Sequence, residues 1–528
     1  MTTQWRDVTS LYQIYPRSFR DTNSDGVGDL RGITSRLDYL SWLRIDAVWI
    51  SPFFTSPMTD FGYDVADYRS VDPIFGSLQD FKQLLKTAHQ HNIKVMIDLV
   101  PCHTSDQHPW FQESRASTDN PKRDWYVWRN GRDNGAPNNW RSLAGGSSWM
   151  LDEATGQYYL HSFLPTQPDL NWDNPEVREA MKSVVRFWFD MGVDGMRVDA
   201  IWGISKDPEL GDDEPNPDFH GPAGEYGAFR HTHCKYGPHF QEYLHELASV
   251  CDEYDDRQMV FEFYPDGQLG DIYDQYQAVL QAHPQGSAFF MEHRQDEWHA
   301  ERAGQAIRRY LTAAGASLPF FCVGNHDQPR ITSRLGPQRA RALQFLNLTC
   351  PGVSVVYYGD EIGMENGELS DDDVRDTFSP NHSPHDSRDR ARTPMQWANA
   401  PHAGFSFVTP WLPVHDNHPT VNVLSQLDDP TSLLRLHRDL LQLRRELPVI
   451  TKGTVTPLQT DSGYVLVLRH SLRDERAYTL VNFADQPQTI TLPETVQLVI
   501  ASETDAATIH RHQITLAPYA AALLSARQ

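Results

Sequence analysis

The stretch GVDGMRVDAIW, residues 192–202, decides the fold class. Its centre, Gly195–Val198, is a short apolar run that ends directly in the charged residue Asp199. Short apolar runs that alternate with longer amphipathic segments, as here up to about residue 450, are typical of βα units in a parallel sheet. Seven other runs have this form: Leu11–Tyr15, Ala47–Ile50, Lys94–Val100, Met259–Phe263, Ser287–Met291, Pro319–Val323 and Val353–Tyr358.

Eight such strands are what a closed (β/α)₈ TIM barrel requires, although counting alone leaves a doubly wound sheet open. Charged side chains that directly follow the apolar runs favour the barrel, because barrel enzymes carry their chemistry at the carboxyl ends of the strands. Asp98, Asp199, Glu262 and Asp327 occupy such positions. We therefore predict an α/β barrel with its site at that end.

Two segments depart from the βα pattern. Residues 104–173, rich in Trp, Asn, Gly and Pro, are too long for an ordinary connection and predict an inserted subdomain after the third strand. Residues 452–528 alternate between apolar and polar positions, which predicts a C-terminal antiparallel β-sandwich domain. The barrel itself is then expected to comprise residues 1–103 and 174–451.

The composition restricts the partners. The 528 residues carry a formal charge of −24, which disfavours nucleic acid and anionic membranes. Five cysteines without a CxxC pair indicate reduced thiols, and the N-terminal residues lack a signal-peptide pattern. We expect a cytoplasmic protein with a small-molecule substrate and no organic cofactor, and the sequence leaves a monomer and a homodimer equally open.

The residues at the strand ends favour glycoside hydrolysis. Arg197 and Asp199 lie two apart on one strand, so both face the same side, and a neighbouring arginine keeps a carboxylate ionised. Glu262 interrupts an apolar, aromatic run, and such surroundings raise the pKa of an unpaired carboxyl group, as suits a general acid. One carboxyl group can attack a sugar while the other donates a proton. A structural ion pair is the plainer alternative for Arg197 and Asp199.

Two further stretches supply polar side chains. IDLVPCHT (residues 97–104) contains His103, and PFFCVGNHDQPR (residues 319–330) contains His326, Asp327 and Arg330. DTNSDGVGDL (residues 21–30) places oxygen-bearing side chains at alternating positions, a spacing that suits a hard cation such as Ca²⁺. A solvated turn rich in Asp and Asn is the alternative for that loop.

The motifs DLVPCH, GMRVDA, VFEF and VGNHD, in this order, closely resemble the four signature regions of the α-amylase family of glycoside hydrolases. LYQIYPRSFRDTNSDGVGDLRGI, SPFFTSPMTDFGYDVADY, QPDLNWDNPEVR and SRDRARTPMQW resemble the branch that contains bacterial α-glucosidases and oligo-1,6-glucosidases. This resemblance covers essentially the whole chain. It implies the same barrel, insertion and C-terminal β domain.

The resemblance also implies residue roles. Asp199 would be the nucleophile, Glu262 the acid/base and Asp327 the third carboxylate. The implied substrate contacts are Asp60, Tyr63, His103, Phe163, Arg197, Ala200, His326, Arg330 and Arg388. The implied ligands of a structural Ca²⁺ or Mg²⁺ are Asp21, Asn23, Asp25, Asp29 and the carbonyl oxygen of Val27. Asp60 and Arg388 would grip the non-reducing end of the substrate, which implies exo action.

These roles imply a retaining α-glucosidase that releases glucose from short α-glucosides and also transfers it to acceptors. Ala200 follows the nucleophile where α-1,6-specific relatives often have Val, so we expect α-1,4 bonds to be preferred. An oligo-1,6-glucosidase, a sucrose or trehalose isomerase of the same family, and a non-catalytic carbohydrate-binding relative are the alternatives. Phe261 is a departure, because the family commonly has a small residue before the acid/base.

Overall fold

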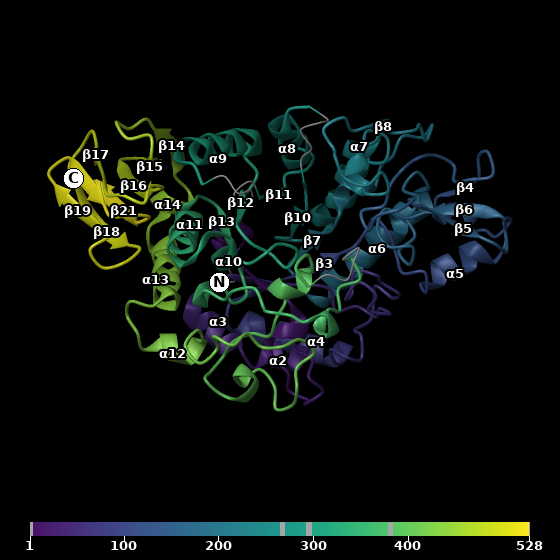
Figure 1. Ribbon diagram of the computed structural model, residues 1–528, viewed down its shortest axis with the longest axis horizontal. Helices are drawn as coiled ribbons and strands as arrows, with labels where there is room; N and C mark the ends of the chain where they lie inside the picture. Colours follow the sequence, from purple (N-terminus) through teal and green to yellow (C-terminus); the bar gives the residue numbers. More distant parts are fainter. Residues whose placement is uncertain (1–3, 265–269, 292–297, 379–383, 527–528) are drawn as a thin grey trace.

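The computed structural model describes residues 4–264, 270–291, 298–378 and 384–526. Eight parallel strands form a closed barrel in the order β1-β13-β12-β11-β10-β7-β3-β2 (Figure 1). The barrel strands are β1 (Ser10–Ile14), β2 (Ala47–Ile50), β3 (Lys94–Leu99), β7 (Gly195–Val198), β10 (Gln258–Phe261), β11 (Gly286–Phe290), β12 (Phe320–Cys322) and β13 (Val353–Tyr357). The predicted TIM barrel is therefore confirmed, with strand limits within one or two residues of the expected ones. A doubly wound sheet is excluded because β1 pairs with both β2 and β13.

Each barrel strand separates two apolar layers. Val260 of β10 belongs to a cluster inside the barrel with Leu11, Trp49 and Phe289. Phe261, the next residue, belongs to the larger cluster that includes the apolar faces of the surrounding helices. This alternation follows from the two-residue period of a strand, and it explains why the strands are apolar throughout.

The surrounding helices have clear sequence signals at their ends. Ser77 and Asp80 form a capping box at the start of α4, and Asn174 caps α6, which ends at the left-handed Gly192. The α-helices of the described residues are α1 (Pro16–Phe19), α2 (Leu30–Thr34), α3 (Leu37–Leu43), α4 (Leu78–Gln90), α5 (Pro109–Ala116), α6 (Pro175–Met191), α7 (Phe240–Ala248), α8 (Ile272–Leu280), α9 (Ala300–Ala314), α10 (Ile331–Leu335), α11 (Pro337–Thr349), α12 (Val423–Leu427), α13 (Leu433–Glu446) and α14 (Pro448–Thr451).

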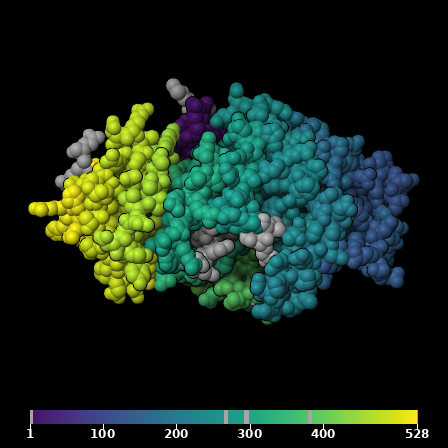
Figure 2. Space-filling view, turned by 90° about the horizontal axis from the view of Figure 1, so that it is seen from above, coloured from purple at the N-terminus to yellow at the C-terminus, as the bar shows by residue number. Residues whose placement is uncertain are grey.

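The two segments that depart from the βα pattern lie at opposite ends of the molecule (Figures 1 and 2). Between β3 and α6, the strands β4 (Trp128–Asn130), β5 (Trp149–Asp152) and β6 (Gln157–Leu160) form a small antiparallel sheet. At the other end, β14 (Thr454–Leu458), β15 (Val465–Leu472), β16 (Glu475–Asn482), β18 (Val496–Ala501) and β21 (Ala521–Ala526) form one sheet. The strands β17 (Gln488–Thr491), β19 (Ala507–His510) and β20 (Gln513–Leu516) form a second. An apolar cluster that includes Val467, Leu480, Ile490 and Ile514 lies between these two antiparallel sheets.

All five cysteines are buried and free, as the absence of a paired spacing indicated. Among the described helices, none combines the length and the apolar character needed to cross a membrane.

Candidate active site

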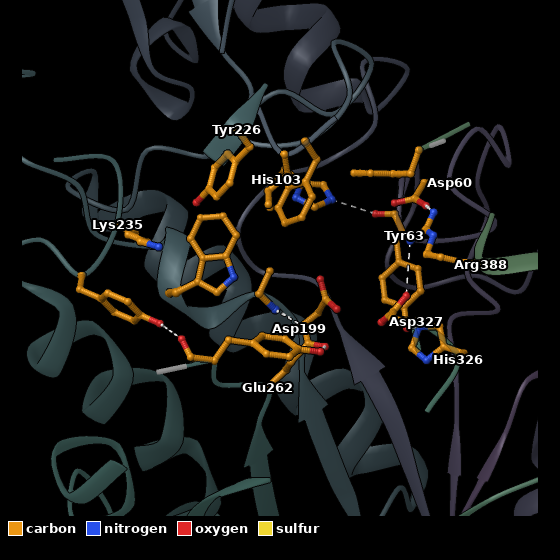
Figure 3. Close-up of a pocket in the computed structure, with 17 residues that line it drawn as sticks. Asp60, Tyr63, His103, Asp199, Tyr226, Lys235, Glu262, His326, Asp327 and Arg388 are labelled. Atoms are coloured by element: carbon orange, nitrogen blue, oxygen red, sulfur yellow. Dashed lines mark hydrogen bonds and ion pairs between the residues drawn. The ribbon is translucent and has the colours of Figure 1, made fainter. Parts of the chain in front are cut away.

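A cavity of about 330 Å³ opens at the carboxyl ends of the barrel strands. Its wall contains eight of the residues that the sequence singled out: Asp60, Tyr63, His103, Phe163, Ala200, His326, Asp327 and Arg388, in addition to Asp199 and Glu262. Figure 3 shows Asp199 and Glu262 between two groups of side chains, with Asp60 and Arg388 on one side and Tyr226 and Lys235 on the other.

The register of the barrel brings the carboxyl groups together. Val198 of β7 pairs with Phe261 of β10, so Asp199 and Glu262 are the next residue on each of two neighbouring strands. Asp98 of β3 pairs with Arg197 of β7 on the other side. Adjacent parallel strands in this register project these four side chains toward the same end of the barrel.

Arg197 is fully buried and contacts three carboxylates. Its Nη1 lies 2.7 Å from Asp98 Oδ1 and 2.5 Å from Asp199 Oδ1, while its Nη2 lies 2.5 Å from Glu262 Oε1. Glu262 also accepts hydrogen bonds from the Ala200 amide at 3.2 Å and from the Tyr264 hydroxyl at 3.1 Å. The expectation of an unpaired Glu262 is therefore wrong, because the strand register places Arg197 beside it.

Burial raises the pKa of Asp199 well above its usual range, and Arg197 opposes this rise only in part. The nearby charges of Glu262, Asp98 and Asp327 add to the rise. Arg197 acts in the expected direction, toward an ionised Asp199, but the effect of burial is larger. The ionisation of Asp199 therefore depends on its burial and on the neighbouring carboxyl groups as well as on Arg197.

Asp327 has the opposite environment. It lies 3.0 Å from Arg392 Nη2, 3.4 Å from Arg388 Nη1 and 3.4 Å from His326 Nε2. Despite burial, these neighbours and Arg197 lower the pKa of Asp327 below its usual range. The site therefore combines one permanently ionised carboxylate with one whose charged form is disfavoured.

The end of the pocket away from Tyr226 is closed by an ion-pair network. Arg388, the first residue of the 3₁₀ helix η10 (Arg388–Ala391), contacts Asp60 at 2.9 Å and Asp376 at 2.6 Å. Gln167 of the inserted subdomain donates a hydrogen bond to Asp60 at 3.0 Å. Burial raises the pKa of Asp60 to about 6, although Arg388 acts against this shift.

The two histidines of the pocket are neutral in the physiological range. Burial lowers the pKa of His103 to about 4 and that of His326 to about 3. His326 Nε2 lies 2.7 Å from the hydroxyl oxygen of Tyr63, whose ring stacks parallel to the imidazole at 5.4 Å. These side chains are therefore suited to hydrogen bonding with sugar hydroxyls rather than to acid catalysis.

Two of the expected contacts do not line the cavity. Arg330 is buried behind the site, where its Nη1 donates a hydrogen bond to the Tyr358 carbonyl oxygen at 2.8 Å and lies 3.6 Å from Asp360. The expected substrate contact for Arg330 is thus corrected to a structural role, because its side chain turns toward the carboxyl end of β13. Arg197 is the second residue that does not line the cavity. It contacts Asp199 and Glu262, which do.

Phe261 does not disturb the pocket. Its fully buried ring lies in the layer between barrel and helices, on the opposite face of β10 from Glu262. A Cβ atom at Gly286 of β11 would lie 3.0 Å from the Phe261 ring, so glycine leaves the space that the large side chain needs.

The wall beyond Glu262 was not predicted from the sequence. It is formed by Trp202, Tyr226, Lys235, Tyr236 and Tyr264, and Leu143 and Phe378 complete the lining. Four of these residues, Trp202, Tyr226, Lys235 and Tyr236, belong to the long segment between β7 and α7, which has no periodic pattern. Its richness in aromatic side chains was the only available signal, and core packing uses aromatic residues more often.

The loop at residues 21–30 is ordered by its own oxygens. Asp21 accepts hydrogen bonds from the amides of Asn23, Ser24 and Gly26, and Asp25 accepts one from the amide of Val27. Asp29 caps the N-terminus of α2. The loop thus carries several oxygen-bearing side chains on a short turn, and oxygen is the donor that Ca²⁺ or Mg²⁺ prefers.

A parallel barrel with adjacent carboxyl groups at the carboxyl ends of its strands, beside a pocket of this size, is the arrangement of a glycoside hydrolase. Residues 13–453 match the family model described as the α-amylase catalytic domain, and the chain belongs to the α-amylase family of glycoside hydrolases.

The chain is similar to named enzymes along nearly its whole length. It is 40% identical to a probable α-glucosidase of Rhizobium meliloti, over 93% of this chain and 91% of that protein. It is 37% identical to an oligo-1,6-glucosidase of Parageobacillus thermoglucosidasius, over 94% and 93%. The crystal structure of an α-glucosyl transfer enzyme superimposes with a TM-score of 0.93 at 37% identity, covering all of both chains. The protein is accordingly a glucosidase or transglycosylase of this family.

Proposed function

We propose that the protein is a retaining, exo-acting α-glucosidase that prefers α-1,4 linkages in short α-glucosides. In this proposal Asp199 is the nucleophile, Glu262 the acid/base and Asp327 the carboxylate that binds the hydroxyl groups of the reacting sugar. Asp60, Tyr63, His103, Phe163, His326 and Arg388 bind the same sugar.

The observation that carries the proposal is the position of the carboxyl groups relative to the closed end of the pocket. Arg388 with Asp60 and Asp376 forms a charged wall beyond Asp327, and Asp199 and Glu262 lie between that wall and the aromatic side. In this proposal a sugar bound against the wall has its anomeric carbon near Asp199, and the wall blocks a further unit on its other side. This geometry favours the release of a terminal glucose.

The reaction then proceeds by two displacements. The Asp199 carboxylate attacks the anomeric carbon, the glycosidic C–O bond breaks, and Glu262 donates its proton to the leaving oxygen. In the second step Glu262 removes a proton from water, whose oxygen attacks the same carbon and releases Asp199. Two inversions give net retention, so glucose leaves as the α anomer.

The linkage preference rests on Ala200. This residue lines the pocket directly after Asp199, where its single methyl group leaves space for an aglycone held through its O4 atom. A difference of one or two methyl groups in a pocket changes the relative transition-state binding of two substrates by about 1–3 kcal/mol. We therefore propose a preference for α-1,4 over α-1,6 bonds rather than strict specificity.

Transfer to an acceptor sugar is the second function that an observation favours. Trp202, Tyr226, Tyr236 and Tyr264 line the cavity, and aromatic faces of this kind stack on sugar rings. An acceptor held there competes with water for the glucosyl intermediate. The similarity to an α-glucosyl transfer enzyme supports the same proposal.

We also propose a structural Ca²⁺ or Mg²⁺ at the loop of residues 21–30. Asp21, Asn23, Asp25, Asp29 and the Val27 carbonyl would hold it, and the oxygen donor set described above fits such an ion. The ion would fix this loop ahead of α2 and would take no part in the bond-breaking steps.

The direct test measures glucose release from maltose, isomaltose, sucrose, trehalose and maltotriose. We expect maltose and maltotriose to be the best substrates, with α-glucose as the first product in proton NMR. Asp199→Asn should abolish the activity, whereas Asp274→Asn on the exposed face of α8 should not.

Several outcomes would contradict the proposal. β-Glucose as the first product would exclude double displacement, and activity retained in Asp199→Asn would exclude the site assignment. Faster release from isomaltose would favour the oligo-1,6-glucosidase, and conversion of sucrose to another disaccharide would favour the isomerase.

A further inference from the structure

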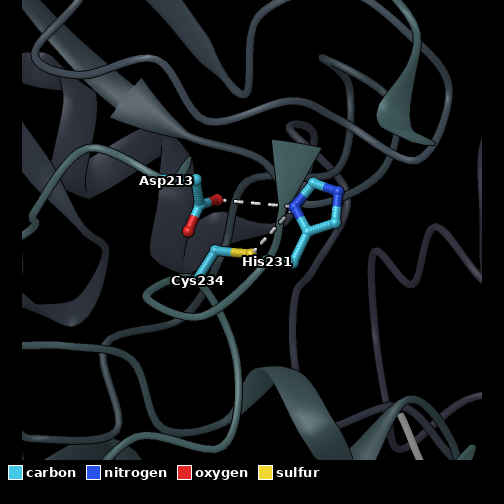
Figure 4. Close-up of side chains that lie close together, drawn as sticks. All are labelled: Asp213, His231 and Cys234. Atoms are coloured by element: carbon cyan, nitrogen blue, oxygen red, sulfur yellow. Dashed lines mark hydrogen bonds and ion pairs between the residues drawn. The ribbon is translucent and has the colours of Figure 1, made fainter. Parts of the chain in front are cut away.

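Three buried side chains form a second cluster in the segment between β7 and α7 (Figure 4). Asp213, His231 and Cys234 are each at most 7% exposed. The short antiparallel strands β8 (Glu214–Pro215) and β9 (Phe229–Arg230) bring them together, because Glu214 pairs with Arg230 and the cluster residues lie next to that pair. We call these three residues the Asp-His-Cys cluster.

The protonation of His231 is fixed by its surroundings. His231 Nε2 lies 2.7 Å from the carbonyl oxygen of Tyr226, which can only accept a hydrogen bond, so Nε2 carries the proton. In the neutral imidazole Nδ1 then has a lone pair. This nitrogen lies 3.4 Å from Asp213 Oδ2 and 3.5 Å from Cys234 Sγ.

Asp213 Oδ2 lacks a compensating donor. The other carboxylate oxygen, Oδ1, accepts a hydrogen bond from the His233 amide at 3.0 Å, but within the described part of the chain no donor reaches Oδ2. A buried carboxylate oxygen without a hydrogen bond is unfavourable. Here it faces the lone-pair side of an imidazole, and a sulfur atom lies against the same nitrogen.

The distances from His231 Nδ1 to the other two atoms match tetrahedral coordination. The three atoms all lie within 4.8 Å of one another. Typical Zn²⁺ bond lengths to N, O and S at tetrahedral angles separate the nitrogen from the oxygen by about 3.3 Å and from the sulfur by about 3.5 Å. The distances in the Asp-His-Cys cluster are 3.4 and 3.5 Å.

We propose that the Asp-His-Cys cluster is a Zn²⁺ site, with Asp213 Oδ2, His231 Nδ1 and Cys234 Sγ as ligands and water in the fourth position. Nitrogen, oxygen and sulfur in one buried set are the ligands that zinc accepts. The Nε2–H bond to the Tyr226 carbonyl oxygen is the kind of outer contact that orients a ligating histidine.

Charge balance is consistent with this ion. On binding, the S–H bond breaks, the proton leaves to solvent and the sulfur–zinc bond forms. The thiolate and the carboxylate then neutralise the two positive charges.

Two other interpretations account for less of the geometry. The first is a metal-free hydrogen bond from the Cys234 thiol to His231 Nδ1. It leaves Asp213 Oδ2 without a donor. A Cys-His-Asp nucleophilic triad requires the thiol and the carboxylate at different imidazole nitrogens, whereas both lie at Nδ1 here, and the thiol is buried.

Zinc in the Asp-His-Cys cluster would organise the part of the pocket that receives the aglycone. The Tyr226 ring stacks on the His231 imidazole at 3.5 Å, and Lys235 and Tyr236 directly follow Cys234. All three line the cavity, and Tyr226 and Lys235 lie on the side opposite Arg388 (Figure 3). A bound zinc would therefore fix the residues that contact whatever lies beyond the scissile bond, while the carboxylates stay unchanged.

The test uses tag-free, full-length protein, because a histidine tag binds zinc itself. Elemental analysis after exhaustive dialysis should find stoichiometric zinc, and protein stripped with a chelator should bind Co²⁺ with an intense sulfur-to-cobalt charge-transfer band. Cys234→Ser should lose the band and most of the zinc. Cys251→Ser, which removes another buried, free thiol, should retain both.

The wild-type measurements decide the matter even if a variant folds poorly. Zinc that dialysis removes completely, together with cobalt binding that lacks the charge-transfer band, would overturn the proposal and leave a thiol–imidazole contact only. A band that persists in Cys234→Ser would also overturn it.

Discussion

At the residue scale, three carboxyl groups of the site share one cation, Arg197. One guanidinium contacts Asp98, Asp199 and Glu262, so none of the three is neutralised by a partner of its own. The residue types and their positions at strand ends were predictable from the sequence. That the three carboxylates share one guanidinium was not predictable, because it depends on the register between β3, β7 and β10. A single sequence does not specify that register.

Arg388 offers a test of the closed pocket end. In Arg388→Lys the charge remains, but the planar fork that contacts Asp60 and Asp376 is lost. We expect kcat/KM for maltose to fall about a hundredfold, which corresponds to roughly 2.7 kcal/mol, with little change in the unfolding midpoint. Arg390→Lys, two residues further along η10 and outside the cavity wall, is the control and should leave kcat/KM near the wild-type value.

Ala200 offers a test of linkage preference. Its backbone is left-handed, with φ +42°, and its amide donates to Glu262. In Ala200→Val the branched side chain fills the aglycone space and strains this conformation. The ratio of maltose to isomaltose hydrolysis should fall about tenfold. Ala200→Gly relieves the strain without filling space and should keep the wild-type ratio; an unchanged ratio in the valine variant would refute the role of Ala200.

At the scale of elements, the barrel strands were the most predictable features. Each is an apolar run bounded by glycine, proline or charge, and the closed barrel then follows from eight βα units. The segment between β7 and α7 was not predictable, because its short strands and 3₁₀ turns depend on long-range contacts. That segment contributes Tyr226 and Lys235 to the pocket and holds the Asp-His-Cys cluster.

The loop before α2 should respond to its cation without affecting catalysis. Removal of Ca²⁺ by a chelator should lower the unfolding midpoint by a few degrees, since an ion that binds only the folded state stabilises it. The KM for maltose should stay constant. In Asp25→Asn the midpoint should lose its calcium dependence, and in the exposed Asp133→Asn it should not. A midpoint insensitive to calcium in the wild type would contradict the proposed site.

The C-terminal strands contain a test of pH dependence. Burial lowers the pKa of His470, a residue of β15, to about 4, whereas an unfolded histidine titrates near 6.5. The unfolded state therefore binds a proton first as the pH falls, so His470 costs stability progressively from about pH 6.5 down to pH 4, by up to about 3 kcal/mol.

In His470→Asn this part of the acid destabilisation should disappear. The unfolding midpoint of the variant should fall less than that of the wild type between pH 6.5 and 4. The exposed His510→Asn should behave like the wild type. Parallel pH profiles for His470→Asn and the wild type would show that the histidine is not buried in its neutral form.

At the scale of the whole molecule, the pocket is assembled from segments far apart in the chain. Asp60 follows β2, Gln167 comes from the inserted subdomain, and Arg388 follows β13, yet they meet at one pocket end. The resemblance in sequence predicted Asp60 and Arg388, whereas Gln167, Asp376 and Arg392 emerged only from the structure. Their supporting roles depend on chain geometry that no local pattern encodes.

The central claim is that Asp199 forms a covalent bond to glucose while Glu262 supplies and removes the proton. Glu262→Gln treated with α-glucosyl fluoride tests it most directly, because fluoride departs without a proton donor and the missing base slows hydrolysis of the intermediate. The account predicts that the protein gains the mass of one glucosyl unit and that peptide mapping places it on Asp199. An adduct on another carboxylate, or full turnover without an adduct, would contradict it.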